Sequence, residues 1–161
     1  DIAVIGTDLN SYKNELESSF DKYDIPYFTD KKVEISSHSL INCVRSVLSF
    51  AVNRSADALF SYLKTGLTDI SEKDICELEN YIFIWNIKPS ALSESFSENP
   101  FGFESHKSKS EIKQKLDYIN DIRKRAVTPL ILFSNEIENS SVSQICSILF
   151  DFLKKNFVVL H

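Results

Sequence analysis

The chain has 161 residues, of which 43% are hydrophobic and 25% charged, with a formal net charge of −5. This apolar content is enough for a folded core, which excludes global disorder, and the acidic balance argues against a surface that grips nucleic acid over its whole extent. No apolar run approaches the ~18 residues of a membrane-spanning helix and no secretory leader is visible, so we expect a cytoplasmic protein. The chain opens at Asp1 and contains no Met, which we interpret as a piece of a longer protein.

Residues 1–35 have the pattern of strand, helix and strand. The run Ile2-Ala3-Val4-Ile5 is typical of a strand covered on both faces, and Ile25-Pro26-Tyr27-Phe28 predicts a second strand. Between them, apolar residues recur every three or four positions, which predicts an amphipathic helix. Because two strands alone are not stable, we expect residues 1–35 to be an α/β fragment of a larger parallel sheet.

From residue 36 onward the pattern is almost entirely helical, so we expect a predominantly α protein. Apolar periodicity predicts helices after Ser36, over residues 58–67, from Ser71, from Ser108 and from Ser141. Pro129 should kink the fourth of these helices or divide it in two. Residues 88–106 are rich in Ser, Pro and Gly, which predicts a loop that could be mobile.

The residue patterns that carry catalysis are missing. There is no phosphate-binding loop, and the three histidines (His38, His106, His161) are too isolated for a metal site. The three cysteines lie far apart, within apolar helical patterns, so we interpret Cys43, Cys76 and Cys146 as buried small hydrophobic residues. Tyr62, Tyr81 and Trp85 could stack on bases, but their spacing beside Leu and Ile favours core positions. The sequence therefore predicts no catalytic residue and no metal site.

One charged stretch differs from the acidic whole. Between positions 107 and 125, seven basic residues face three acidic ones. Two interpretations stay open: an ordinary solvated helix face, or an edge that contacts phosphates of DNA. The DNA-contact candidates are Lys107, Lys109, Lys113, Lys115, Arg123, Lys124 and Arg125.

Several segments, in this order, resemble a known family. They are Asp1-Ile2-Ala3-Val4-Ile5-Gly6, then Tyr23-x-Ile25-Pro26-Tyr27-Phe28, then Arg45-Ser46-x-Leu48, then Leu59-Phe60-x-Tyr62-Leu63-Lys64-Thr65-Gly66-Leu67, and finally Asp74-Ile75-x-x-Leu78-Glu79-Asn80-Tyr81 with Trp85-x-Ile87. This combination resembles the helicase-like core of the AddB (RexB) subunits of AddAB-type helicase–nucleases. The similarity covers nearly the whole chain and is weaker after residue 105. Thr7 departs from the family, which is usually basic there, so that turn is given no DNA or nucleotide contact.

The resemblance implies a role for the parent protein. Residues 1–35 would be part of the second RecA-like domain, and residues 36–161 its helical, 2B-like insertion. The parent would pair with an AddA-type helicase–nuclease subunit in the cytoplasm and process double-strand DNA breaks for recombinational repair. It would bind single- and double-stranded DNA and use ATP, Mg²⁺ and an iron–sulfur cluster, with none of these cofactors held in this piece. The piece itself would be non-catalytic, with a role in shaping the DNA channel or contacting the partner subunit.

Two alternatives remain. One is the insertion domain of an active UvrD-like superfamily-1 helicase, which an upstream phosphate-binding loop would reveal. The other is a stand-alone helical domain that binds proteins. The strand-like segments at the start argue against this second alternative, because such a domain would not retain half of a RecA-like sheet.

Overall fold

The computed structural model describes residues 3–5, 7, 11–28, 35–103 and 107–156. The chain divides into two compact units, Asp1–Glu34 and Ile35–His161. This division does not by itself identify a RecA-like segment or its insertion, so that assignment stays a prediction.

In the first unit, the predicted helix is present as α1, Lys13–Lys22. Its partly buried ring of Phe20 lies 5.0 Å from that of Tyr27, between ring centroids. The carbonyl of Phe20 accepts a hydrogen bond from the N–H of Ile25 at 2.9 Å, just past the end of the helix. A ring contact and a backbone hydrogen bond thus join the residues after α1 to the helix.

The predicted strand–helix–strand fragment is wrong. Residues 3–5 and 25–28 have no strand structure among the described residues. Ile5 and Phe28, which should be covered in a buried strand, are 93% and 91% exposed. A strand forms only when a neighbouring strand accepts and donates its backbone hydrogen bonds, and an apolar run does not supply that neighbour. The prediction of a predominantly α protein is confirmed.

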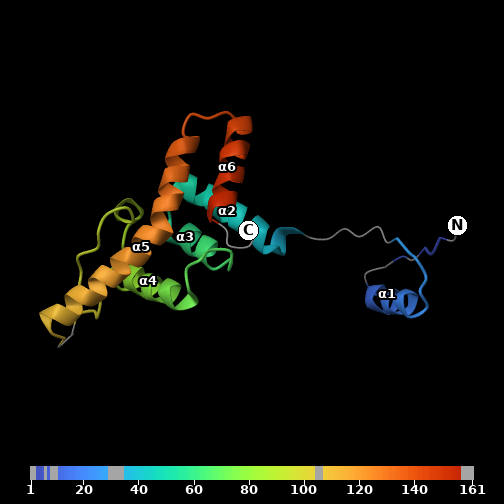
Figure 1. The fold of residues 1–161 in the computed structure, drawn as a ribbon, viewed down its shortest axis with the longest axis horizontal. Helices are drawn as coiled ribbons and strands as arrows, with labels where there is room; N and C mark the ends of the chain where they lie inside the picture. The colour runs from blue at the N-terminus through green and yellow to red at the C-terminus, as the bar shows by residue number, and fades with distance from the viewer. Residues whose placement is uncertain (1–2, 6, 8–10, 29–34, 104–106, 157–161) are drawn as a thin grey trace. The chain divides into compact units, whose positions relative to one another are not determined.

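Among the described residues of the second unit, five α-helices follow one another (Figure 1): α2, Ser39–Asn53; α3, Ala56–Leu63; α4, Glu72–Ile84; α5, Lys109–Ile137; and α6, Val142–Asn156. Two short 3₁₀ turns, η1 (Ile35–Ser37) and η2 (Pro89–Ala91), complete it. Side chains cap the starts of these helices, because the first turn of a helix leaves N–H groups without partners. Ser55, Ser71 and Ser108 each accept a hydrogen bond from the third residue of the helix they precede.

Of the two outcomes predicted for Pro129, a kink or a division of the helix, the division does not occur, since α5 is one helix of 29 residues, Lys109–Ile137. Figure 1 shows the helix changing direction along its length, as the missing N–H of an internal proline favours. Buried side chains follow on both sides of the proline, including Val127, Leu130 and Phe133. Packing of this apolar face holds the helix together across the proline.

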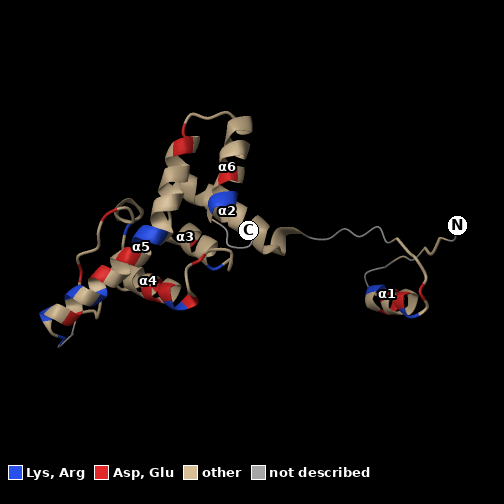
Figure 2. Cartoon of the chain, viewed as in Figure 1, with Lys and Arg blue, Asp and Glu red and all other residues tan. Residues whose placement is uncertain are grey.

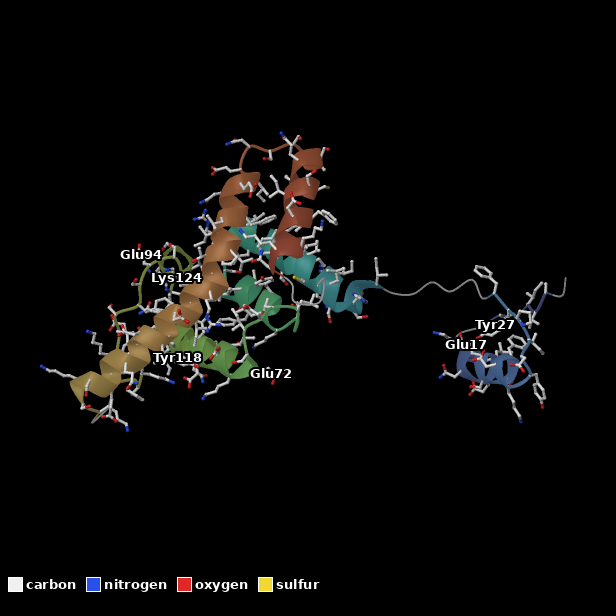
Figure 3. The ribbon with its side chains drawn as sticks, in the orientation of Figure 1. Glu17, Tyr27, Glu72, Glu94, Tyr118 and Lys124 are labelled. Atoms are coloured by element: carbon white, nitrogen blue, oxygen red, sulfur yellow. The ribbon has the colours of Figure 1, made fainter. Side chains whose placement is uncertain are left out.

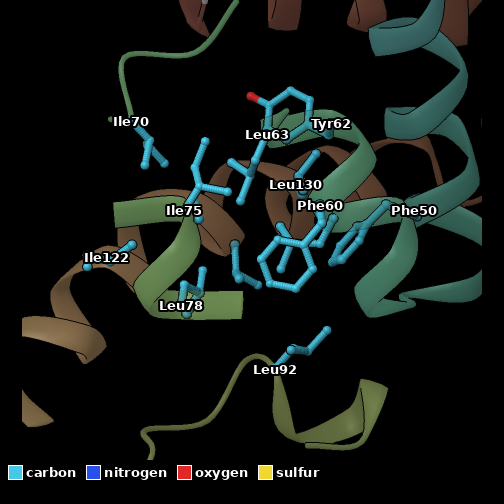
Figure 4. Close-up of a cluster of buried hydrophobic side chains, with 14 of the residues drawn as sticks. Phe50, Phe60, Tyr62, Leu63, Ile70, Ile75, Leu78, Leu92, Ile122 and Leu130 are labelled. Carbon is cyan, nitrogen blue, oxygen red and sulfur yellow. The ribbon is translucent and has the colours of Figure 1, made fainter. Parts of the chain in front are cut away.

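The core of the second unit gathers around α5 (Figure 4). Each fully buried Leu, Ile or Phe there contributes about 2 kcal/mol through removal from water. The largest side chains with almost no exposure are Phe50, Leu59, Leu63, Leu78, Leu92, Ile119, Ile122, Leu130 and Phe133. Leu92 belongs to the segment between α4 and α5, so that segment takes part in the core.

Candidate nucleic-acid interface

The candidate site is α5, which carries all seven predicted DNA-contact residues except Lys107, two positions before its start. Its beginning is fixed by a capping box: the Ser108 hydroxyl accepts the Glu111 N–H, and the Glu111 carboxylate accepts the Ser108 N–H at 3.0 Å. Lys107 forms an ion pair with the same carboxylate at 3.4 Å. Lys107 therefore contributes to the start of the helix.

One side of α5 forms ion pairs with α4. Lys115 lies 2.6 Å from the carboxylate of Glu77, and Arg125 lies 3.2 Å from that of Asp74. The Tyr118 hydroxyl also donates a hydrogen bond to Asp74. This bond, together with those from Arg125 and Ser71, holds the pKa of Asp74 below its ordinary value. Two of the seven basic candidates therefore link helices within the chain.

Arg123 is the one buried member of the set, with 9% of its surface exposed. Its guanidinium donates to the carbonyls of Leu92 at 3.3 Å and Ser93 at 2.9 Å. It also lies over the ring of Phe96, 5.7 Å from the centroid. Burial lowers the pKa of this guanidinium, but an arginine remains charged at neutral pH. The structure gives Arg123 a structural role and leaves it without access to a phosphate.

Arg123 contacts the segment of residues 86–103, which contains the described part, 88–103, of the loop predicted over residues 88–106. Asn120 makes two hydrogen bonds to the backbone of Phe96, donating to its carbonyl at 3.0 Å and accepting from its N–H at 2.8 Å. Tyr81 and Trp85, at the end of α4, donate to the carbonyls of Glu98 and Asn99 at 3.0 and 3.1 Å. Side chains of α4 and α5 hold the backbone of this segment, which argues against the predicted mobility.

The remaining three candidates, Lys109, Lys113 and Lys124, are exposed and form no ion pair with the described residues. They are four and eleven residues apart, close to one and three helical turns, so they lie on one side of α5 over about 22 Å. Asp117 lies near this side, leaving an excess of positive charge. These three lysines are the exposed members of the predicted set that form no ion pair with the described residues.

The charges are mixed along the helices (Figure 2): both signs occur on α5, while α4 is mainly acidic. Figure 3 labels Tyr118 and Lys124, two residues of α5 on different sides of the helix. Within α5, Asp121 and Arg125 form an ion pair at 3.0 Å. On α4, Glu77 pairs with Lys115 and Glu79 pairs with Lys64, each at 2.6 Å.

The other predicted site residues have structural positions. His38 caps α2, accepting the Leu40 N–H on its Nδ1 at 3.3 Å, while His106 and His161 lie outside the described residues. Tyr62 and Tyr81 are core residues, as their spacing predicts. The prediction of three buried cysteines is right for Cys43 alone, where burial raises the pKa of the thiol to about 12.

Among the residues that the structure describes, no three His, Cys, Asp or Glu side chains gather so that they could hold a metal ion. Cys43, Cys76 and Cys146 lie on three different helices, α2, α4 and α6, where Cys43 is buried and the other two are exposed. Within the same ranges, no helix is both long and apolar enough to pass through a membrane.

Sequence reasoning missed Asn120, Asp74 and Tyr118, which fix α5 to its surroundings. Of these three residues, only Asp74 lies in a recognisable sequence pattern, three positions after the helix-capping Ser71. An asparagine or tyrosine at a half-buried helix position has no spacing that identifies its partner.

Comparison with known proteins identifies relatives over nearly the whole chain. No protein-family model matches it. It is 38% identical over 157 residues to the B-type subunit of the ATP-dependent helicase/deoxyribonuclease of Acetivibrio thermocellus, and 39% identical over 155 residues to that of Clostridium novyi. It is also 35% identical over 158 residues to that of Clostridium acetobutylicum. Each match covers 95% of this chain but only 13% or 14% of the relative.

The chain thus spans about one seventh of the length of these curated relatives. Because each match covers 95% of the chain, it extends over most of the segments that carried the resemblance described above. The resemblance is therefore confirmed: this chain is related, over nearly its whole length, to one segment of the AddB-type subunits of ATP-dependent helicase/deoxyribonucleases.

Proposed function

We propose that the chain is a non-catalytic segment of an AddB-type subunit that helps to guide DNA in a helicase–nuclease acting on double-strand breaks. The observation that carries this proposal is the similarity to AddB-type subunits over 95% of the chain. The acidic residues of α4 and α5 support the non-catalytic part. Asp74, Glu77 and Asp121 are paired with basic side chains of the same unit, which leaves them poorly suited to a two-metal nuclease site.

The side of α5 formed by Lys109, Lys113 and Lys124 supports contact with DNA. Exposed lysines attract phosphates without reading sequence, which suits a wall along which DNA moves. A rigid helix spaces them well, and the contacts of α5 with α4 and the 86–103 segment fix its orientation within the unit. The proposed DNA-contact set is therefore smaller than the seven residues that the sequence predicts.

A second candidate function is contact with an AddA-type partner subunit. Apolar side chains are exposed on α5 and α6, with Leu132 at 59%, Val142 at 78% and Phe150 at 59%. Exposed large hydrophobic residues often belong to protein interfaces. ATP, Mg²⁺ and an iron–sulfur cluster belong, in this proposal, to other parts of the parent protein.

The alternatives are an active UvrD-like motor and a stand-alone protein-binding domain. The relatives' names favour a helicase–nuclease component over both. A phosphate-binding loop encoded upstream in the same gene would favour the active UvrD-like helicase.

Photo-crosslinking in the parent complex tests the proposal. A p-benzoyl-phenylalanine placed at position 113 should crosslink to a DNA substrate, and one at position 150 should crosslink to the partner subunit. A probe at Lys73, exposed on α4, is the control. Crosslinks from position 113 to the partner subunit alone would replace the DNA role by the subunit-contact role. No crosslink above the control from either position would contradict both.

A further inference from the structure

A polar groove lies between α2 and α3, with a volume of about 700 Å³. Its lining comes from one side of each helix: Asn42, Arg45, Ser46 and Ser49 on α2, and Ala58, Ser61 and Thr65 at and after α3. These spacings of three and four residues place the groups in two facing rows. The groove is lined mainly by hydroxyl groups, unlike the more apolar groove between α5 and α6.

Several of these groups are free to bind a ligand. The Ser46 and Thr65 hydroxyls donate to the carbonyls of Asn42 and Tyr62, each at 2.7 Å. In contrast, Arg45, Ser49 and Ser61 make no side-chain hydrogen bond or ion pair with the described residues, and all three are exposed. Ser55 accepts the Ala58 N–H at 3.2 Å, and its own O–H remains to donate.

Small residues alone would only allow the two helices to pack closely. Arg45 changes the chemistry, because a guanidinium carries a permanent charge and five N–H donors that match phosphate oxygens. The other charges on the groove are Lys64, which pairs with Glu79 at 2.6 Å, and Asp57, which opposes an anion. Among the described residues, Arg45 is therefore the cation of the groove that has no partner.

We propose that the groove between α2 and α3 binds a phosphate group, with Arg45 as the charged contact and the Ser49, Ser55 and Ser61 hydroxyls as further donors. Charge-assisted bonds from arginine and bonds from hydroxyls are the usual contacts of a phosphate oxygen. This inference goes beyond the proposed function, because it assigns a second site on helices other than α5. The phosphate can belong to a nucleic-acid backbone or be free in solution.

The test is an NMR titration of the 161-residue chain, whose second unit has its own core. The probes are inorganic phosphate and a short oligothymidylate, added separately. We expect saturable shifts of the Arg45 side-chain N–H and of the Ser49 and Ser61 amides. Saturation by the oligothymidylate at much lower concentration identifies a nucleic-acid backbone as the ligand, and equal saturation by inorganic phosphate identifies a free phosphate.

Three variants make the result specific. Arg45→Gln should weaken binding about tenfold, since it removes a charge-assisted contact. Asp57→Asn should strengthen it, because the opposing charge is lost. Lys73→Gln, an equal loss of charge on α4, should leave it unchanged.

A two-dimensional spectrum of each variant establishes that it is folded. The inference is overturned if neither probe shifts the groove residues, or if Arg45→Gln and Lys73→Gln weaken binding equally. Replacing Lys109, Lys113 and Lys124 by Gln should leave the shifts at Arg45 in place. Failure of the proposed role of α5 is thereby distinguished from failure of this site.

Discussion

The basic residues of α5 fall into two groups with different surroundings. Toward α4 and the 86–103 segment, Lys115, Arg123 and Arg125 bind carboxylates and carbonyls of the same unit. The other group, Lys109, Lys113 and Lys124, is exposed without ion pairs to the described chain, and we call it the outer side of α5. Arg123 and Lys124 are neighbours in sequence, yet about 100° apart around the helix. A cluster of charges in sequence therefore predicts a surface only after each residue is assigned to its side of the helix.

The largest effect should follow from removing the buried guanidinium. Arg123→Ala leaves the carbonyls of Leu92 and Ser93 without their donor, so we expect a loss of about 2–3 kcal/mol in the free energy of unfolding. Urea denaturation measures this loss. The neighbouring Lys124→Ala should change stability by less than about 0.5 kcal/mol. Similar losses in the two variants would contradict the distinction between Arg123, which is bound within the unit, and the exposed Lys124.

A smaller effect should follow at Asn120, which holds the 86–103 segment through the backbone of Phe96. Asn120→Ala should cost about 1–2 kcal/mol, because both Phe96 backbone groups lose their partner. The Phe96 amide should also exchange its hydrogen faster, which mass spectrometry or NMR can follow. Unchanged exchange at Phe96 would show that the segment is held by other contacts.

A still smaller effect should follow from Asp74, which joins Tyr118 and Arg125 of α5 to α4. Its pKa is below the ordinary value of 3.8, so its contribution is fully present above pH 3.8 and is lost as pH falls through the folded-state pKa. Asp74→Asn should therefore destabilise the chain by about 1 kcal/mol at pH 7.

The same variant should lose stability less steeply than the wild type below pH 4, which denaturation across pH measures. Asn80→Asp, at an exposed position of α4, is a control that adds a carboxylate without these partners. Parallel pH curves for Asp74→Asn and the wild type would contradict the assigned role of Asp74.

Much of the helical part could be predicted from the sequence, because its signals are local. The Ser71 and Ser108 caps and the apolar periodicity gave helix starts within one residue of α4 and α5. Local patterns could not decide whether residues 2–5 and 25–28 form strands, since strand formation depends on a partner strand elsewhere. The same holds for the site: charge is visible in sequence, but the acids Asp74 and Glu77 that bind Arg125 and Lys115 are about 40 to 50 residues away.

The most direct test of the central claim is binding of labelled single-stranded DNA by the 161-residue chain across a salt series, measured by fluorescence anisotropy. We predict that replacing Lys109, Lys113 and Lys124 by Gln weakens binding and makes the negative slope of log affinity against log salt shallower by about 2, at ~0.7 per phosphate contact. Replacing Lys115 and Arg125 by Gln should leave that slope unchanged. Equal slopes for the wild type and the triple variant, or a larger change in the Lys115 and Arg125 variant, would contradict the claim that the outer side of α5 is the DNA-contacting side.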